Sequence, residues 1–555
     1  MTAVGGRMEA VTPRRSLFGP DYLRLGVLAA VSIAVHLWLI GHTAVTARDS
    51  IGFARYALAV QSPQSASIPP DPTRKELDII RREQHPPGYP LAVWFVAKFV
   101  RRATNLPLPD STLLATQLVS ALAALLLVVP MYLLGRMLFG RNVGFAAALL
   151  FQVLPVPARV TSDGLAEATY LLAGCTALAL GVRAVRRPGT GVFLSCGLVV
   201  GLTYLVRPEG LMVAGAVGLV VGWLGLLRRW PRDLALGRLA ALGVGVALVA
   251  APYMIFIGKI TNKPTGSEIL APIQGPRGML RTGEPGHGAV ARVGGPVFGA
   301  WWTVSDGAGP LGLIWPAVAG AGKEIGKGLH YFGAAFAVAG LFALRRRIVA
   351  DPGVALLVTL LGVNLAVLVG LGARGYVVNQ THTFYISERH TVLIVLIGCL
   401  FAAGALPELR RALPGSLGAG RCVPVALLAL MVVASLPSAL KPLHPNREGH
   451  KQAGRWLKEH IRDADCLIDP FEWAAYYSGR TLYFIPSDPP GEPEITYAVV
   501  DDKDREDDHA RLPRMRPALD VAADGNSRIV YHWPEDRPVE EARVKVYRLV
   551  RPKQK

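Results

Sequence analysis

Residues 47–59 read ARDSIGFARYALA, and residues 84–90 read QHPPGYP. The first stretch places an acidic residue, Asp49, at the head of a short amphipathic run, and the second turns the chain at two prolines. An apolar run of bilayer length, residues 22–41, comes just before them. We therefore expect both stretches to lie in a loop where a membrane helix meets water, and we expect the rest of the chain to support that loop.

The composition excludes a soluble protein of this length. Of the 555 residues, 51% are hydrophobic and 18% are charged, and the mean hydropathy is +0.35. A soluble chain needs far more charge to cover its surface. The net charge is +19, but the arginines stand mostly beside apolar runs, which is typical of membrane topology and argues against a nucleic-acid partner. The cysteines form no CxxC pair, so the sequence predicts neither a disulfide framework nor a metal site.

Apolar runs of bilayer length predict a polytopic α-helical membrane protein with about eleven transmembrane helices. The predicted spans are residues 22–41, 111–135, 142–158, 163–184, 190–206, 209–227, 236–257, 329–344, 353–372, 388–406 and 422–440. The segment 88–100 is apolar but short, so we expect an interfacial or re-entrant helix there. The first span is long enough to remain in the membrane as a signal anchor.

The positions of the arginines predict the orientation. If residues 1–21 are a cytoplasmic segment, the cytoplasmic turns receive most of the basic residues, among them Arg136, Arg186, Arg228, Arg345 and Arg410. The transmembrane domain then covers residues 22–443, with large external loops at 42–110 and 258–328. This orientation fits a bacterial inner membrane with the C-terminus outside.

The tail, residues 444–555, changes character and predicts a small extracytoplasmic α/β domain. Residues 447–457 have helical spacing, and short β-prone runs are found at 466–468, 495–500, 529–531 and 544–549. The sequence has no glycine-rich nucleotide loop. The acidic run that begins at Asp501 is interpreted as a solvated loop.

Ionisable residues gather at the predicted external ends of the spans, where each has a structural and a functional interpretation. Asp49 is a favoured residue type for a helix N-cap, and His85 precedes two prolines as turn residues often do. Asp163 and Glu167 are four residues apart and so share a helix face; Asp163 also suits a cap. Arg207 and Glu209 can simply close a turn, and Arg389, near Tyr385, can be an interface arginine that extends toward water.

In their order along the chain, these motifs resemble the external loops of GT-C membrane glycosyltransferases. The similarity is strongest to the protein O-mannosyltransferase and aminoarabinose transferase superfamily, whose members use polyprenyl-phosphate sugar donors. The motifs that carry it are the Asp49 loop, His85-Pro86-Pro87, the acidic turn at Asp163 and Glu167, Arg207-Pro208-Glu209-Gly210, and the segment from Tyr385 to Arg389. Many relatives have two adjacent acids in the first loop, but here Ser50 takes the second place.

The resemblance implies transfer of a sugar, with inversion, to the hydroxyl of an unknown acceptor: a protein, a lipid or a glycan. It implies that Asp49 is the general base and that Asp163 and Glu167 are further catalytic carboxylates. The implied substrate-binding residues are His85, Arg207, Glu209, Tyr385 and Arg389, with the two arginines on the phosphate. The implied partners are the polyprenyl-phosphate sugar and membrane lipid. No cofactor is certain, although some relatives bind a divalent cation.

Two other classes of protein stay open at this point. A transporter or flippase of lipid-linked sugars would more often show internal repeats and broken helices at mid-membrane. A non-catalytic envelope-assembly protein would have no need of Asp49 or Glu167.

Overall fold

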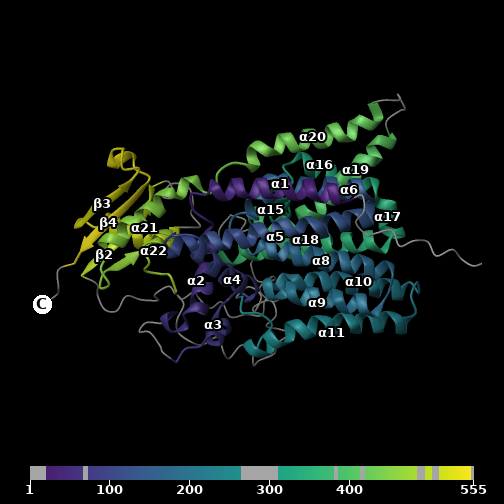
Figure 1. Cartoon of the computed structure of the whole chain (residues 1–555), viewed down its shortest axis with the longest axis horizontal. Coiled ribbons are helices and arrows are strands. Elements are labelled where there is room, and N and C mark those ends of the chain that lie inside the picture. Colours follow the sequence, from purple (N-terminus) through teal and green to yellow (C-terminus); the bar gives the residue numbers. More distant parts are fainter. Residues whose placement is uncertain are drawn as a thin grey trace, which may run out of the picture.

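The computed structural model describes residues 21–66, 73–263, 310–379, 386–412, 419–483, 494–502 and 512–551. Long helices form a bundle, a small β-sheet lies beyond one end of it, and helices α2 (Arg48–Gln61), α3 (Glu76–Arg82) and α4 (Gly88–Ala103) lie near that same end (Figure 1). The bundle helices are α1 (Tyr22–Gly41), α5 (Leu108–Phe139), α6 (Arg141–Val153), α8 (Glu167–Arg186), α9 (Thr190–Val206), α10 (Leu211–Leu226), α11 (Arg232–Ile257), α15 (Pro310–Gly328), α16 (Phe332–Ala343), α18 (Pro352–Asn379), α19 (Val392–Ala412) and α20 (Ala419–Ala439).

Short helical elements connect the long ones. They are η2 (Pro63–Ala66), α7 (Pro155–Val160), η3 (Pro208–Gly210), α17 (Arg345–Ala350) and η4 (Glu388–Thr391). The three arginines of α17 lie at the end of the bundle away from the sheet (Figure 1).

In the described ranges, eight helices are long and apolar enough to cross a membrane, or nine if one bent pair counts as a single span. The predicted count of eleven is therefore not confirmed. Residues 142–158 are divided at Leu154 into α6 and α7, because Leu154 precedes Pro155 and takes the extended conformation that a following proline favours. Residues 190–206 form a helix of only 17 residues.

The third predicted span that differs is 329–344. It is the second arm of a helix pair bent by 106°. His330 and Tyr331 at the bend both have positive φ angles, of 53° and 56°, and such residues cannot continue a right-handed helix. The bend is therefore built into the backbone.

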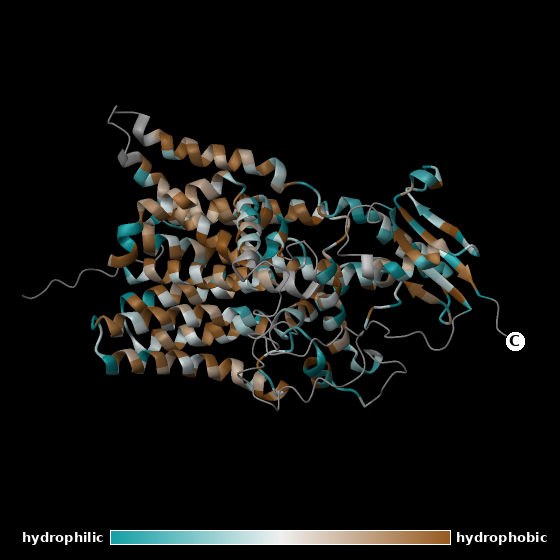
Figure 2. Ribbon diagram, turned by 180° about the vertical axis from the view of Figure 1, so that it is seen from behind, coloured by the Kyte–Doolittle hydropathy of each residue, from teal (hydrophilic) through white to brown (hydrophobic). Residues whose placement is uncertain are grey.

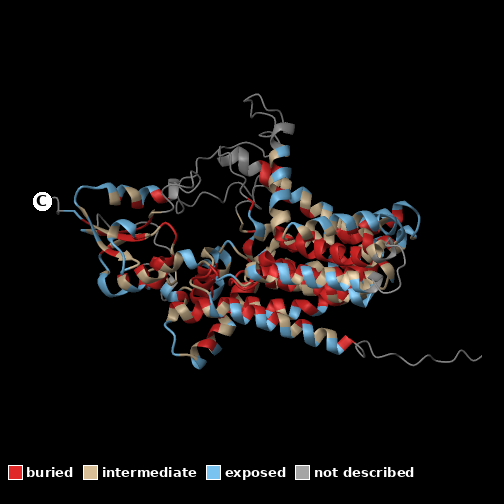
Figure 3. Cartoon of the chain, turned by 90° about the horizontal axis from the view of Figure 1, so that it is seen from above, coloured by how far each residue is buried: buried red, intermediate tan, exposed pale blue. Residues whose placement is uncertain are grey.

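Burial separates a central span from those that face lipid. Helix α19 is central, since 83% of the apolar window in Glu388–Leu409 is buried, against 17% in Cys422–Ala439 of α20. The outer helices α1, α11 and α20 instead expose large apolar side chains, among them Leu37, Leu236, Ile255, Val425 and Val433. Apolar residues colour most of the bundle in Figure 2, and the buried ones concentrate inside it in Figure 3. Such an exposed apolar surface fits a bilayer.

The prediction of a small C-terminal α/β domain is confirmed. Its strands are β1 (Cys466–Ile468), β2 (Ile495–Asp501), β3 (Ser527–Trp533) and β4 (Val544–Val550), in the sheet order β1-β2-β4-β3. Strand β1 pairs parallel to β2, and the other pairs are antiparallel. Helices α21 (Glu448–His460), α22 (Trp473–Tyr477) and α23 (Leu512–Ala523) complete the domain.

Both faces of this sheet are covered. Tyr497 and Val499 of β2 pack in one apolar cluster with Leu457 of α21, whereas Ala498 and Val500 pack in another with residues of α23. This follows from strand geometry, because successive side chains point to opposite faces.

Helix α4 occupies the segment expected to be an interfacial or re-entrant helix. Tyr89, Val93, Ala97 and Val100 are buried along one face, while Phe95 and Phe99 are more than half exposed. A Cβ atom on Gly88 would lie 2.7 Å from the carbonyl oxygen of Leu205. The start of α4 can therefore approach the C-terminal end of α9 this closely only because residue 88 is glycine.

Candidate active site

Asp49 lies in the first turn of α2, with its side chain about half exposed. The N-cap of this helix is Ala47, and no side chain caps it. The Asp49 carboxylate therefore does not cap the helix and is available for other contacts. It accepts a hydrogen bond from Nη1 of Arg389 and forms an ion pair with it.

Arg389 is presented by η4, the short turn that leads into the central helix α19. Arg389 therefore lies at the N-terminal end of a buried span. Tyr385, which the sequence assigns to the same segment, lies outside the described residues.

Four charged residues form a second, connected group. Nη1 of Arg207 donates to Oε1 of Glu167 over 2.6 Å, and Nη2 lies 3.5 Å from Oε1 of Glu209. Nζ of Lys263 donates to the same Glu209 oxygen over 3.0 Å. Glu167 is 4% exposed, so its charge depends on Arg207 for compensation. The residue of this group that the sequence interpretation missed is Lys263, a cation six residues beyond the C-terminal end of α11.

His85 links the two groups. Its ring lies 4.9 Å from that of Phe53, which belongs to α2. A proton on His85 would be disfavoured by the charges of Lys263 and Arg207 and favoured by that of Asp49. Burial first, and then the positive charges of Lys263 and Arg207, lower the pKa of His85 to about 4. Its imidazole is thus neutral near neutral pH and can accept a hydrogen bond.

Asp163 holds backbone near the site. Its Oδ1 accepts from the backbone N–H of Ala47 over 2.8 Å, and its Oδ2 lies 2.7 Å from Nε2 of His444. The hydroxyl of Ser50 donates to the Asp163 carbonyl over 2.7 Å. The next residue, Gly164, has φ +68°, and a Cβ atom there would lie 2.3 Å from Oγ1 of Thr116. This tight turn fixes Asp163 against the start of α2.

The charges of the site are balanced. Arg207, Lys263 and Arg389 face three carboxylates, those of Asp49, Glu167 and Glu209. Partial burial acts to raise the pKa of the Asp49 carboxyl, but the guanidinium of Arg389 outweighs it and holds that pKa below its ordinary value. Arg389 also interacts electrostatically with Glu167 and Arg207. An anion that binds in the site can pair with Arg207, Lys263 or Arg389, but each of these cations must first break its ion pair with a carboxylate.

The ion pairs of the three carboxylates also affect whether the site can bind a divalent cation. Asp49, Glu167 and Glu209 each contact a guanidinium or an ammonium group. Across the ranges that the structure describes, no group of three His, Cys, Asp or Glu side chains is placed to hold a metal ion. The donor set therefore does not fit a metal in this arrangement.

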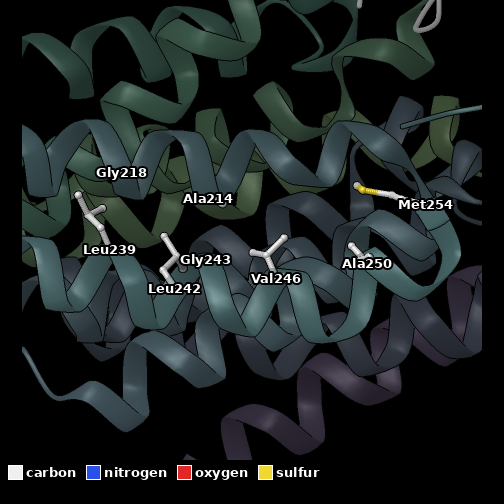
Figure 4. A pocket seen from close by; sticks show the side chains of 10 residues that line it. Ala214, Gly218, Leu239, Leu242, Gly243, Val246, Ala250 and Met254 are labelled. Carbon is white, nitrogen blue, oxygen red and sulfur yellow. The ribbon is translucent and has the colours of Figure 1, made fainter. Parts of the chain in front are cut away.

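An apolar groove of about 420 Å³ runs between α10 and α11 (Figure 4). Leu239, Leu242, Val246, Ala250 and Met254 line it along α11, and Ala214 and Gly218 line it along α10. Met254 is near the end of α11 that leads to Lys263.

A family model described as dolichyl-phosphate-mannose-protein mannosyltransferase matches residues 84–256. The matched region includes His85, Asp163, Glu167, Arg207 and Glu209. No curated protein sequence matches the chain.

The solved structures that are similar in fold to most of this chain include the following two. ArnT from Cupriavidus metallidurans, in the apo state, is 13% identical to this chain. The TM-score is 0.53, and the match covers 96% of this chain and 100% of ArnT. The oligosaccharyltransferase of Archaeoglobus fulgidus, described as a complex with Zn and sulfate, is 13% identical with a TM-score of 0.51. That match covers 85% of this chain and 58% of the archaeal protein. At these identities the similarity concerns the fold.

Proposed function

We propose that this chain, whose fold is similar to those of ArnT and the archaeal oligosaccharyltransferase, is a GT-C membrane glycosyltransferase. In this proposal it transfers a sugar from a polyprenyl phosphate to an acceptor hydroxyl. The resemblance noted in the sequence is thereby confirmed at the level of fold. The observation that carries the proposal is the pair formed by Asp49 and Arg389. It brings a candidate base and a candidate phosphate ligand together at the external ends of the spans.

The donor class is supported by the family match and by the position of the site. The matched family is described by a dolichyl-phosphate sugar donor. Glu167, Arg207 and Arg389 lie where a helix of the bundle begins or ends, and Asp49 of α2 is paired with Arg389. A donor whose lipid remains in the bilayer would bring its phosphate to this depth. We propose that the groove between α10 and α11 binds part of the polyprenyl chain of the donor, since α11 leads from the groove to Lys263.

In the proposed reaction, Asp49 takes the proton of the acceptor hydroxyl while the acceptor oxygen forms a bond to the anomeric carbon of the sugar. The bond from that carbon to the phosphate oxygen breaks, with inversion, and polyprenyl phosphate leaves. General base catalysis of this kind typically contributes 10²–10⁴-fold. Arg389, Arg207 and Lys263 stabilise the charge that develops on the phosphate.

The donor phosphate and Asp49 compete for the same guanidinium in this scheme. When Arg389 turns to the phosphate, the Asp49 carboxylate is released and becomes a stronger base. Binding of the donor thus prepares the base. We propose Asp163 and Glu167 as residues that hold the start of α2 and Arg207 in place, and Glu209 and His85 as neighbours of the bound donor.

We propose that the site faces the extracytoplasmic side of a bacterial inner membrane. The arginines of α17 at the opposite end of the bundle support this orientation, because cytoplasmic turns are enriched in basic residues.

The decisive experiment supplies the purified protein with a panel of radiolabelled polyprenyl-phosphate hexoses and pentoses, with nucleotide sugars as controls. We expect consumption of one lipid-linked sugar and release of polyprenyl phosphate, and the panel identifies the sugar. Efficient use of a nucleotide sugar without a lipid intermediate would overturn the proposal. Transfer that depends on Asp49 would separate an enzyme from a flippase, which moves the donor without consuming it.

A further inference from the structure

Glu472 of the C-terminal domain lies between two arginines of α2. One carboxylate oxygen accepts from Nη2 of Arg48, and the other accepts from Nη1 of Arg55. The two arginines are two helical turns apart and so lie on the same face of α2. We propose that Glu472 is a positioning residue, which fixes α2 and holds Arg48 away from Asp49. This inference rests on the proposed function, in which Asp49 is the base.

Other contacts make the attachment of α2 to the C-terminal domain specific. Arg55 is 6% exposed, and it donates from Nε to the carbonyl oxygen of Thr481 over 2.5 Å and from Nη2 to its hydroxyl over 2.6 Å. Nε1 of Trp473 donates to the carbonyl oxygen of Thr46 over 3.0 Å. An apolar cluster surrounds these bonds and contains Val45, Ile51 and Ala54 from the α2 region with Phe471, Trp473, Tyr476 and Tyr477.

The backbone at Glu472 points to a role for its side chain. Glu472 has φ +70°, a left-handed conformation that glycine adopts without cost and other residues adopt less easily. Asp469 maintains the turn, because its carboxylate accepts from the backbone N–H groups of Phe471 and Ala475 over 3.1 and 2.9 Å. If residue 472 only had to form this turn, glycine would adopt the left-handed conformation at a lower conformational cost than glutamate. The carboxylate between two arginines explains why a side chain stands there.

The contact between Glu472 and Arg48 can affect the basicity of Asp49. It directly precedes Asp49, and its charge interacts with that carboxylate. While Glu472 accepts from Arg48, the guanidinium is directed toward the C-terminal domain. Without that acceptor, Arg48 is free to pair with Asp49, which would weaken the base and shift it from the acceptor.

Glu472→Gln tests the proposal, because it keeps the shape of the side chain and removes its charge. We expect kcat to fall on the order of ten- to a hundred-fold, as small displacements of catalytic groups do. KM for the donor should stay unchanged or decrease, since Arg207 and Lys263 are not touched and an Arg48–Asp49 pair would release Arg389. Hydrogen–deuterium exchange should increase in peptides that cover residues 48–61 and stay unchanged in the sheet. Asp463→Asn is the matched control, since it removes an exposed ion pair with Arg480 elsewhere in the same domain.

Two further variants separate positioning from folding. Glu472→Gly suits the left-handed backbone, so we expect a normal melting temperature together with the same loss of kcat. Adding Arg48→Gln to Glu472→Gln should restore part of the lost kcat, because the released guanidinium is then gone. A purely structural role predicts no such rescue.

The outcomes distinguish this inference from the proposed function. Unchanged exchange in α2 and unchanged kcat in Glu472→Gln would overturn the inference, and so would faster exchange in α2 with normal kcat. Absence of sugar transfer by the wild-type protein with every lipid-linked donor would overturn the proposed function and, with it, the part of the inference that concerns Asp49. Faster exchange in α2 alone would then still support the attachment through Glu472.

Discussion

The guanidinium of Arg389 forms an ion pair with the carboxylate of Asp49, although 340 residues separate them in the chain. The pair joins α2, outside the bundle, to the turn that begins the central helix α19. Asp49 therefore has two positions open to it, paired with Arg389 or released to act on an acceptor, and an incoming phosphate can decide between them.

The first prediction concerns Asp49→Asn. The amide cannot take a proton from the acceptor, so kcat should fall by about 10²–10⁴-fold. Affinity for polyprenyl phosphate should stay the same or increase, because Arg389 no longer has to leave a carboxylate. Turnover and equilibrium binding of polyprenyl phosphate measure the two effects separately. Normal turnover in a folded Asp49→Asn protein would remove the catalytic assignment.

The second prediction concerns Arg389→Lys. A lysine keeps the charge but loses the planar fork that binds phosphate in a bidentate manner, so donor affinity should weaken by about ten-fold. Arg389→Gln removes the charge as well. Because Arg389 holds the pKa of Asp49 below its ordinary value, that pKa should rise, and kcat/KM should start to fall at a higher pH as the medium is acidified. Arg102→Gln, at an exposed position in the last turn of α4, is the control, and an equal shift in both variants would contradict the prediction.

The third prediction concerns Glu167→Gln. Glu167 is buried beside Arg207, and breaking such a pair typically costs about 3–5 kcal/mol. Glu209 still contacts Arg207 in this variant, so the loss of stability should be near the lower end of that range. We expect a lower melting temperature than for Asp49→Asn and weaker donor binding through a less fixed Arg207. An unchanged melting temperature with reduced kcat alone would instead favour a direct role of Glu167 in the reaction.

The sequence was enough to predict which charged residues gather at one end of the spans. Spans alternate in direction, so Asp49, Glu167, Arg207 and Arg389 fall at the same membrane surface once the spans are known. The division of 142–158 was also predictable in principle, because Pro155 and Pro157 stand inside it. The bend after Gly328 has a weaker signal, since histidine is found at positive φ more often than most residues but tyrosine is not.

The pairing of the charges could not be predicted from the sequence. Whether Arg207 meets Glu167 or Asp49 depends on how the helices pack, which a pattern of apolar runs does not determine. Lys263 was missed because it stands six residues after the span 236–257, at the start of a loop rich in glycine and proline. Glu472 lies in the soluble tail, and only the folded structure places it beside Arg48.

The last prediction concerns His85 and stability toward acid. Its pKa is lowered from 6.5 to about 4 in the folded chain, chiefly by burial. Between these two pH values the unfolded chain binds a proton at His85 and the folded chain does not, so stability should decline as the pH falls from about 6.5 to about 4. The full shift in the pKa of His85 corresponds to roughly 3 kcal/mol in the free energy of unfolding. In His85→Gln this contribution is absent, so its melting temperature should depend less steeply on pH than that of the wild type. Phe53→Leu removes the same ring contact without removing a titratable group, and it should lower the melting temperature while keeping the wild-type slope. Equal slopes in the wild type and His85→Gln would show that His85 is not held neutral between Asp49 and Lys263.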